Sequence, residues 1–167
     1  GFSEVNQIIK ALNTQSGKQF FSKNYQLNID REYIFIFKIS KENLSFEILE
    51  NQHKISTPFT MELSKSTDRK VVKDRVIAKL DFDKLKFPLV LRKWKQGDKF
   101  MPLGMPTFKK VSDFFIDNKY SLIAKQQQWI LCSADDIIWI VGDRIDDRFK
   151  ITTQTKNVYI AEILKDK

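Results

Sequence analysis

The apolar positions near the start of the chain repeat at helical spacing. Val5, Ile8, Ile9 and Leu12 follow the i, i+3, i+4, i+7 pattern of a single helix face. Ser3 precedes them at a position where its hydroxyl would cap the first turn, and the Ser-Gly pair at residues 16–17 is a stop signal. The pattern predicts a short amphipathic helix that ends before residue 17.

Beyond residue 18 the period changes to two, which is typical of short strands with one buried face. Polar turns separate these segments. The predicted strands cover residues 19–21, 25–29, 33–39, 44–49, 55–63 and 76–80. Residues 64–75 are strongly charged, and they indicate a flexible connector or an exposed hairpin arm.

In the second half of the chain, strong turn signals surround a single helical segment. A strand at residues 89–91 leads into turns at Gly97-Asp98 and residues 102–106. Lys109 to Asn118 then has a helical pattern, with Val111, Phe114 and Phe115 on one face. Further strands are predicted at residues 129–132, 137–141 and 157–164.

Together these elements predict an α+β fold in two parts. The first part, residues 1–75, is a short N-terminal helix followed by a β-rich connecting region. The second part, residues 76–167, is a β-sandwich-like C-terminal domain with one packed helix, in which Phe114, Phe115 and Trp139 belong to the core.

Composition supports a globular chain in the cytoplasm. Apolar residues make up 42% and aromatic residues 13% of the sequence, enough to build a core. No apolar run reaches the roughly 18 to 20 residues that a membrane span needs, and the first residues lack the features of a signal peptide. Because the chain starts with Gly1 and not Met, we expect it to be a piece of a larger protein.

The net charge of +8 is concentrated in one part of the chain. Residues 89–125 contain eight basic and three acidic side chains, which gives +5, whereas residues 126–167 have six and seven, which gives −1. Such a basic segment is either a solvated surface or a binding site for a polyanion.

Several kinds of chemistry are disfavoured by what the sequence lacks. No two of the five glycines are close enough for a Gly-rich phosphate loop. One histidine, His53, and one cysteine, Cys132, cannot supply the four ligands of a structural zinc site. The carboxylate pairs at residues 135–136 and 146–147 are better explained by turns than by acid–base catalysis.

The positive signal is the alternation of cations and aromatics from Arg92 to Phe100, continued by Lys109 and Lys110. Cations neutralise phosphates, and exposed aromatics stack on bases, although core packing is the favoured role of Trp94 and Phe100. Lys109 and Lys110 also lie at the start of the predicted helix, where the helix dipole favours an anion.

These residues resemble the C-terminal domain of tRNA(Ile)-lysidine synthases. The family pattern joins a basic residue, the motif G-D-x-F-x-P-x-G, the motif K-K-x-S-D-F-F-I-D, and a strand ending W-x-V-G-x-R-I-D-x-R-F. Here the matching segments are Arg92 and residues 97–104, 109–117 and 139–149. The match is dense between residues 80 and 152 and loose before residue 75.

The resemblance implies a role in an enzyme that converts the wobble cytidine of tRNA(Ile) to lysidine, using ATP with magnesium and free lysine. The S-G-G-x-D-S pyrophosphate loop of the family's N-terminal catalytic domain does not occur in this chain, so we expect the chain to use no cofactor and to carry out no chemistry itself. By the same resemblance, its partners are tRNA(Ile), which it positions, and its own N-terminal catalytic domain.

The candidate RNA contacts are six cations of the basic segment, two polar or acidic residues within it, and one arginine beyond it: Arg92, Lys95, Lys99, Lys109, Lys110, Ser112, Asp113, Lys119 and Arg144. Gly97, Pro102 and Gly104 would shape the loop between them. One departure from the family pattern is Asp143, whose carboxylate we expect to hold the adjacent Arg144.

Two other functions stay open. The chain is alternatively a protein-interaction or dimerisation module that docks on its own catalytic domain, with a homodimer as one form of it. A hydrolase that uses the carboxylate pairs ranks much lower. A salt titration of tRNA binding separates the two leading hypotheses, because only phosphate contacts give a steep salt dependence.

Overall fold

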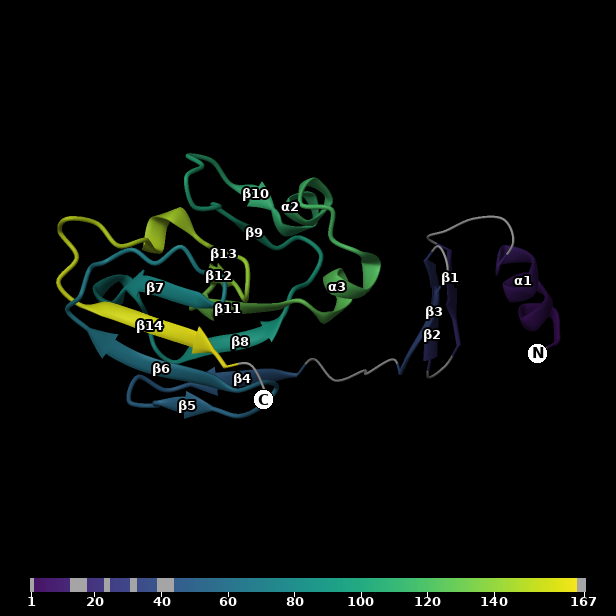
Figure 1. Ribbon diagram of the computed structural model, residues 1–167, viewed down its shortest axis with the longest axis horizontal. Coiled ribbons are helices and arrows are strands. Elements are labelled where there is room, and N and C mark those ends of the chain that lie inside the picture. The colour runs from purple at the N-terminus through teal and green to yellow at the C-terminus, as the bar shows by residue number, and fades with distance from the viewer. Residues whose placement is uncertain (1, 13–17, 23–24, 31–32, 39–43, 165–167) are drawn as a thin grey trace. The chain divides into compact units, whose positions relative to one another are not determined.

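The computed structural model describes residues 2–12, 18–22, 25–30, 33–38 and 44–164 (Figure 1). The chain forms two compact units, Gly1–Asn43 and Leu44–Lys167. The predicted helix stop at residues 16–17 lies outside the described residues, as do residues 23–24, 31–32 and 41–43 of the polar turns expected between the first strands.

The first unit contains the predicted helix and a small antiparallel sheet. Helix α1 covers Phe2–Leu12. Strands β1 (Gln19–Phe21), β2 (Tyr25–Asp30) and β3 (Tyr33–Lys38) follow in spatial order β1-β2-β3. Ser22 ends the first strand, where its hydroxyl accepts a hydrogen bond from the Tyr25 amide at 3.0 Å.

The second unit is a sandwich of two antiparallel sheets. The five-stranded sheet has the order β13-β12-β11-β8-β4, and the four-stranded sheet has the order β5-β6-β14-β7. In chain order these strands are β4 (Ser45–Ile48), β5 (Lys54–Ile55), β6 (Met61–Ser66), β7 (Ile77–Asp81), β8 (Leu89–Lys93), β11 (Trp129–Ser133), β12 (Asp136–Ile140), β13 (Arg144–Ile145) and β14 (Val158–Ile163).

The main core lies between the two sheets. Side chains that alternate along the strands meet there, among them Leu89 and Leu91 of β8, Leu131 of β11, Trp139 of β12 and Ala161 of β14. Each is at most 1% exposed. This is the packing that a period of two predicts when one face of each strand is buried.

A second core covers the other face of the five-stranded sheet. It is formed with helix α2 (Val111–Asp117) and a two-stranded ribbon of β9 (Lys99–Phe100) and β10 (Lys109–Lys110), beside which α2 lies in Figure 1. Phe100, Phe114 and Phe115 pack there against residues of β11 and β12. Because full burial of a Phe side chain contributes roughly 1.5–3 kcal/mol, these rings hold the ribbon to the sheet.

The α+β class is confirmed, while three details differ from the sequence analysis. The predicted strand 55–63 is divided into β5 and β6, because Pro58 lies in the turn between them. The predicted helix 109–118 starts only at Val111, since Lys109 and Lys110 belong to the ribbon. A second short helix, α3 (Leu122–Gln127), follows α2 and is capped by the Ser121 hydroxyl.

The division of the chain also differs from the expected boundary after residue 75. Along the sequence, the boundary between the two compact units falls between residues 43 and 44. Strand β4 pairs with β8, and β6 pairs with β14, so the segment 44–66 belongs to the same sheets as the C-terminal strands. Beyond Ser66, the charged segment is a loop that leads into β7.

No helix in the described ranges is long and apolar enough to cross a membrane.

Candidate functional site

The β9–β10 ribbon presents two lysines side by side. Lys99 and Lys110 are directly paired across the ribbon, as are Phe100 and Lys109. Because directly paired residues point to the same face, the fully buried ring of Phe100 leaves Lys99 and Lys110 on the opposite, exposed face. A pair of like charges in this position is unfavourable unless an anion lies between or above them.

An aromatic ring completes this surface. Phe108 lies just before β10, two residues from Lys110, and it is 49% exposed. The Lys99 ammonium lies 5.4 Å and the Arg148 guanidinium 4.7 Å from the centroid of its ring. We call Lys99, Phe108 and Lys110 the ribbon face. It combines two exposed cations with an exposed ring, which are the groups that contact RNA phosphates and unstacked bases.

The turn before the ribbon is held by Asp98. Its carboxylate accepts two hydrogen bonds of 2.9 Å from the Arg92 guanidinium and one of 2.8 Å from the Lys95 amide. The Asp98 carbonyl accepts a further bond of 2.9 Å from the Val111 amide. Arg92 therefore fixes the turn that carries Lys95 and Lys99. Its hydrogen bonds to Asp98 raise the pKa of the Arg92 guanidinium above its ordinary value.

The loop between β9 and β10 is anchored by the carboxylates of Asp146 and Asp147, beside and within the short helix η2 (Asp147–Phe149). Asp146, which is fully buried, accepts a hydrogen bond of 2.8 Å from the Met101 amide, and Asp147 accepts one of 2.8 Å from the Gly104 amide. The Gly104 backbone has φ +87°, a conformation that favours glycine.

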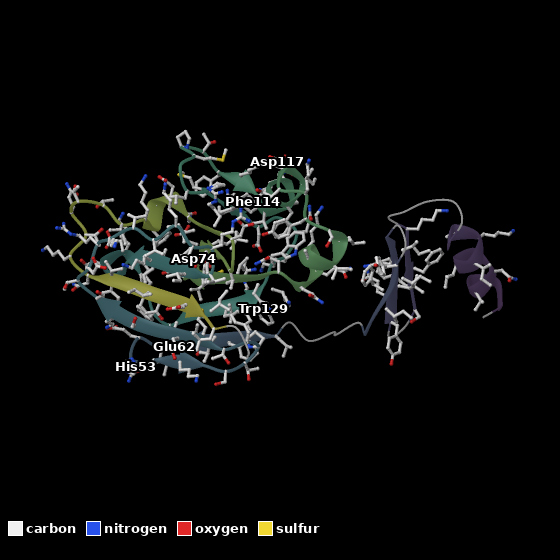
Figure 2. The ribbon with its side chains drawn as sticks, in the orientation of Figure 1. His53, Glu62, Asp74, Phe114, Asp117 and Trp129 are labelled. Carbon is white, nitrogen blue, oxygen red and sulfur yellow. The ribbon has the colours of Figure 1, made fainter. Side chains whose placement is uncertain are left out.

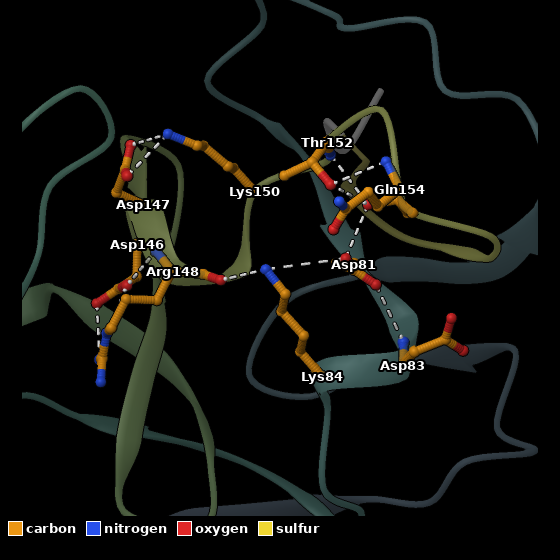
Figure 3. A network of polar contacts seen from close by, with 10 residues as sticks. Asp81, Asp83, Lys84, Asp146, Asp147, Arg148, Lys150, Thr152 and Gln154 are labelled. Carbon is orange, nitrogen blue, oxygen red and sulfur yellow. Dashed lines mark hydrogen bonds and ion pairs between the residues drawn. The ribbon is translucent and has the colours of Figure 1, made fainter.

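Arg148 joins this anchor to the rest of the sandwich. Its guanidinium donates to Asp146 through Nε and Nη2, both at 2.9 Å, and to Asp136 through Nη1 at 2.7 Å. Figure 3 shows the bonds between Arg148 and Asp146, together with the Lys84 ammonium, which reaches the Arg148 carbonyl at 2.9 Å. Asp146 also caps η2 through the Arg148 amide, so the second carboxylate pair has a structural role.

The structure divides the predicted RNA-binding cations into those held in ion pairs and those that are not. Arg92 is bound by Asp98, and Lys109 is paired with Asp117 at the end of α2. In the part of the chain that the structure describes, no ion pair engages the four exposed lysines of the predicted set: Lys95, Lys99, Lys110 and Lys119.

The two polar candidates lie together at the start of α2. The Ser112 hydroxyl donates a hydrogen bond of 3.2 Å to the exposed Asp113 carboxylate. Figure 2 shows the neighbouring Phe114 and Asp117 on the same helix. Since Asp113 is an acid, it would repel a phosphate, and only an amine or a base edge would suit it as a ligand.

Arg144 belongs to β13 and lies at the wall of a cavity that also contains Asp143. The expected pairing of the two was wrong, because Asp143 instead accepts a hydrogen bond from the Tyr120 hydroxyl. No ion pair between described residues involves Arg144. Its guanidinium is thus available for a ligand of the cavity.

Phe108 and Arg148 belong to the site but were not among the residues predicted from the sequence. The two aromatics that the sequence did indicate, Trp94 and Phe100, pack in the second core, as the favoured interpretation predicted. The signal that would have identified Phe108 is its place between a Gly-Pro turn region and two lysines, where no apolar periodicity explains a phenylalanine.

The residues considered for other chemistry are placed as follows. Cys132 is buried in the second core, and burial raises the pKa of its thiol to about 11, which keeps it a neutral thiol at pH 7. His53 lies on the far side of the sandwich, near Glu62 (Figure 2). Within the described residues, no group of three or more His, Cys, Asp and Glu side chains is placed to hold a metal ion.

The fold and these motifs agree with known domains. Residues 89–162 match the family model of the TilS substrate C-terminal domain, and residues 1–39 match that of the TilS substrate binding domain. A crystal structure of a TILS C-terminal domain aligns with a TM-score of 0.61 at 15% identity, covering 74% of this chain and 100% of that one. The chain thus matches two substrate-domain family models of TilS, and its β-sandwich has the fold of the TILS C-terminal domain.

Sequence similarity to tRNA(Ile)-lysidine synthases extends over nearly the whole chain. The tRNA(Ile)-lysidine synthase of Parabacteroides distasonis is 41% identical over 98% of this chain, and that of Bacteroides thetaiotaomicron is 34% identical over 97%. The chain belongs to the tRNA(Ile)-lysidine synthase family. It spans 39% and 36% of the lengths of these two relatives.

Proposed function

We propose that this chain binds and positions tRNA(Ile) for a lysidine synthase, and that it performs no chemistry itself. The observation that carries the proposal is the ribbon face, where Lys99 and Lys110 are paired beside the exposed ring of Phe108. Lys95 and Lys119, which are also exposed, add positive charge along the same segment. The enzyme's reaction would convert the wobble cytidine to lysidine with ATP and lysine.

A separate tRNA-holding module has a clear physical use. Duplex RNA is recognised mainly through its shape and backbone, so a rigid set of cations is sufficient to hold it. A second binding site at fixed spacing also raises the effective concentration of the target base at a distant catalytic domain. The Asp98 and Asp146 anchors supply rigidity, because Asp98 holds the turn before β9 and Asp146 holds Met101 directly after β9.

The residues that the structure describes do not suit the ATP and magnesium of that reaction. Gly97, Gly104 and Gly142 have positive φ values of 94°, 87° and 77°. Each lies in a turn of its own, so their amides do not form the continuous cradle that nucleotide phosphates need. We therefore assign ATP, magnesium and lysine to the catalytic domain, which would be the chain's protein partner.

A salt titration tests the proposal. The affinity of the 167-residue chain for a tRNA(Ile) transcript is measured by fluorescence anisotropy between about 50 and 300 mM salt. Each neutralised phosphate contributes about 0.7–0.9 to the log–log slope, so the exposed lysines predict a slope of about −3. A chain that serves only in protein docking would show no tRNA affinity at any of these salt concentrations, and that result would contradict the proposal.

A further inference from the structure

A cavity of about 430 Å³ lies between residues 71–75 and the edge of the sandwich. Its apolar lining includes Ile77 of β7, Ile145 of β13, Leu103 and Ile151. Small-molecule sites in proteins typically enclose about 300–1,000 Å³ with mainly apolar walls and a few polar groups. The cavity therefore has the size and the lining of a ligand site.

One wall of the cavity is held in place by polar bonds. The Lys79 ammonium donates to the Asp68 carboxylate at 3.1 Å, and the Arg69 guanidinium donates to a backbone carbonyl of the loop before β14 at 2.6 Å. Between these anchors and β7, Val71 and Val72 line the cavity and are 68% and 40% exposed. The segment is thus held at residues 68–69 and at β7, while the two valines between them remain exposed. Their side chains offer apolar surface to a ligand.

The charges around the cavity favour an anionic ligand. Lys73, Arg75 and Arg144 line it, and no ion pair with another described residue engages any of them. The two acids of the lining are outnumbered by its cations and are hydrogen-bonded, since Asp74 accepts a bond of 3.0 Å from the Val76 amide and Asp143 accepts one from the Tyr120 hydroxyl. Figure 2 labels Asp74 beside β7.

We propose that this cavity binds one unpaired nucleotide of RNA, with the base against Ile77, Ile145 and Leu103 and a phosphate beside Arg75 and Arg144. The inference rests on the proposed function and adds a site apart from the ribbon face. A phosphate alone would need no apolar lining, and a paired nucleotide would have to be unpaired and unstacked first, which costs free energy. A single nucleotide satisfies both the apolar and the cationic walls.

The cavity is tested directly with adenosine monophosphate and with inorganic phosphate, added separately to the chain carrying labelled isoleucine methyl groups. We expect the monophosphate to shift the NMR signals of Ile77, Ile145 and Ile151 in a saturable way, with inorganic phosphate at equal concentration having a much smaller effect. Equal shifts with both would indicate an anion site only. That outcome, or the absence of any shift, would overturn the inference.

Two variants locate the phosphate. Arg75→Gln combined with Arg144→Gln should weaken binding of the monophosphate about tenfold or more, because a charge-assisted hydrogen bond is lost at each position. Lys54→Gln combined with Lys156→Gln is the charge-matched control, since both lysines are exposed and neither lines the cavity. An Arg75/Arg144 variant that binds the monophosphate as tightly as the Lys54/Lys156 control would also overturn the inference.

RNA probes separate this inference from the proposed function. The Arg75/Arg144 variant should lose about tenfold in affinity for a single-stranded oligonucleotide and change less than about twofold for blunt duplex RNA. An equal loss for both would mean that the arginines act only through general electrostatics, against the inference. If the unsubstituted chain binds neither RNA, the proposed function fails. The monophosphate titration still shows whether the cavity binds a nucleotide.

Discussion

Lys99 and Lys110 face each other across a ribbon whose strands are only two residues long, and both ammonium groups are exposed. The arrangement is unfavourable for the free protein because like charges lie on directly paired positions. A bound phosphate would relieve the repulsion. The two like charges therefore favour binding of a phosphate but lower the stability of the free protein.

Replacing both residues, Lys99→Gln with Lys110→Gln, should weaken tRNA(Ile) binding by more than about tenfold and reduce the log–log salt slope by about 1.5. Stability should stay unchanged or rise slightly, because the repulsion is removed. Anisotropy and urea unfolding measure the two effects. Lys54→Gln with Lys156→Gln, which removes two exposed lysines elsewhere, should alter the affinity far less. Equal losses in the two double variants would argue against a localised site.

Phe108 is expected to contribute through its ring. The substitution Phe108→Leu keeps an apolar side chain but removes the surface on which a base stacks, so affinity for single-stranded RNA should fall about tenfold. Since the side chain is 49% exposed, folding should be little affected. Ile116→Ala on α2 is the matched control, because this residue is 62% exposed and is not aromatic. Unchanged RNA affinity in Phe108→Leu would remove the ring from the site.

Asp98 and Asp117 offer a comparison between a buried and an exposed ion pair. The Asp98 side chain is 8% exposed and binds Arg92 in a fork, whereas that of Asp117 is 58% exposed and meets Lys109. Asp98→Asn should cost about 3 kcal/mol of unfolding free energy, since a partly buried guanidinium loses its charge partner. Asp117→Asn should cost less than about 1 kcal/mol. Urea unfolding of the two variants that gave equal costs would contradict this account.

Lys93 predicts a pH dependence of stability. Its ammonium donates to the Gln127 carbonyl and lies 4.3 Å from the centroid of the Trp129 ring, yet burial lowers its pKa to about 8. Between this value and about 10.4, the unfolded chain holds more protons at this site than the folded chain. The free energy of unfolding should therefore rise with pH across that window, and the contribution should be lost as the pH falls through about 8.

The comparison with Lys93→Met isolates this group. Between pH 7 and pH 10 the unmodified chain should gain about 1 kcal/mol relative to the variant, a value reduced for the solvent that still reaches the ammonium. Urea unfolding at several pH values measures the difference. Parallel pH profiles for the two proteins would show that Lys93 titrates normally.

Much of the secondary structure could be predicted, and the failures have a common cause. Strands such as β11 and β12 are long enough for apolar periodicity to identify them, and the core positions of Phe114, Phe115 and Trp139 were predicted correctly. Strands β9 and β10 were missed because two residues carry no period. The pairing of β4 with β8 joins positions about 44 residues apart, and no local pattern encodes it.

By itself, the order of apolar, polar and charged residues determined the fold class, the core of the second half, the concentration of positive charge, and the family motifs. These properties are local, because they depend on neighbours within a few positions along the chain. Only the tertiary structure decided which cations are available. Arg92 and Lys109 are engaged by carboxylates six and eight residues away, while Lys99, Lys110 and Arg144 are not. Ion pairing depends on distance in space, and the chain sets that distance only after it has folded.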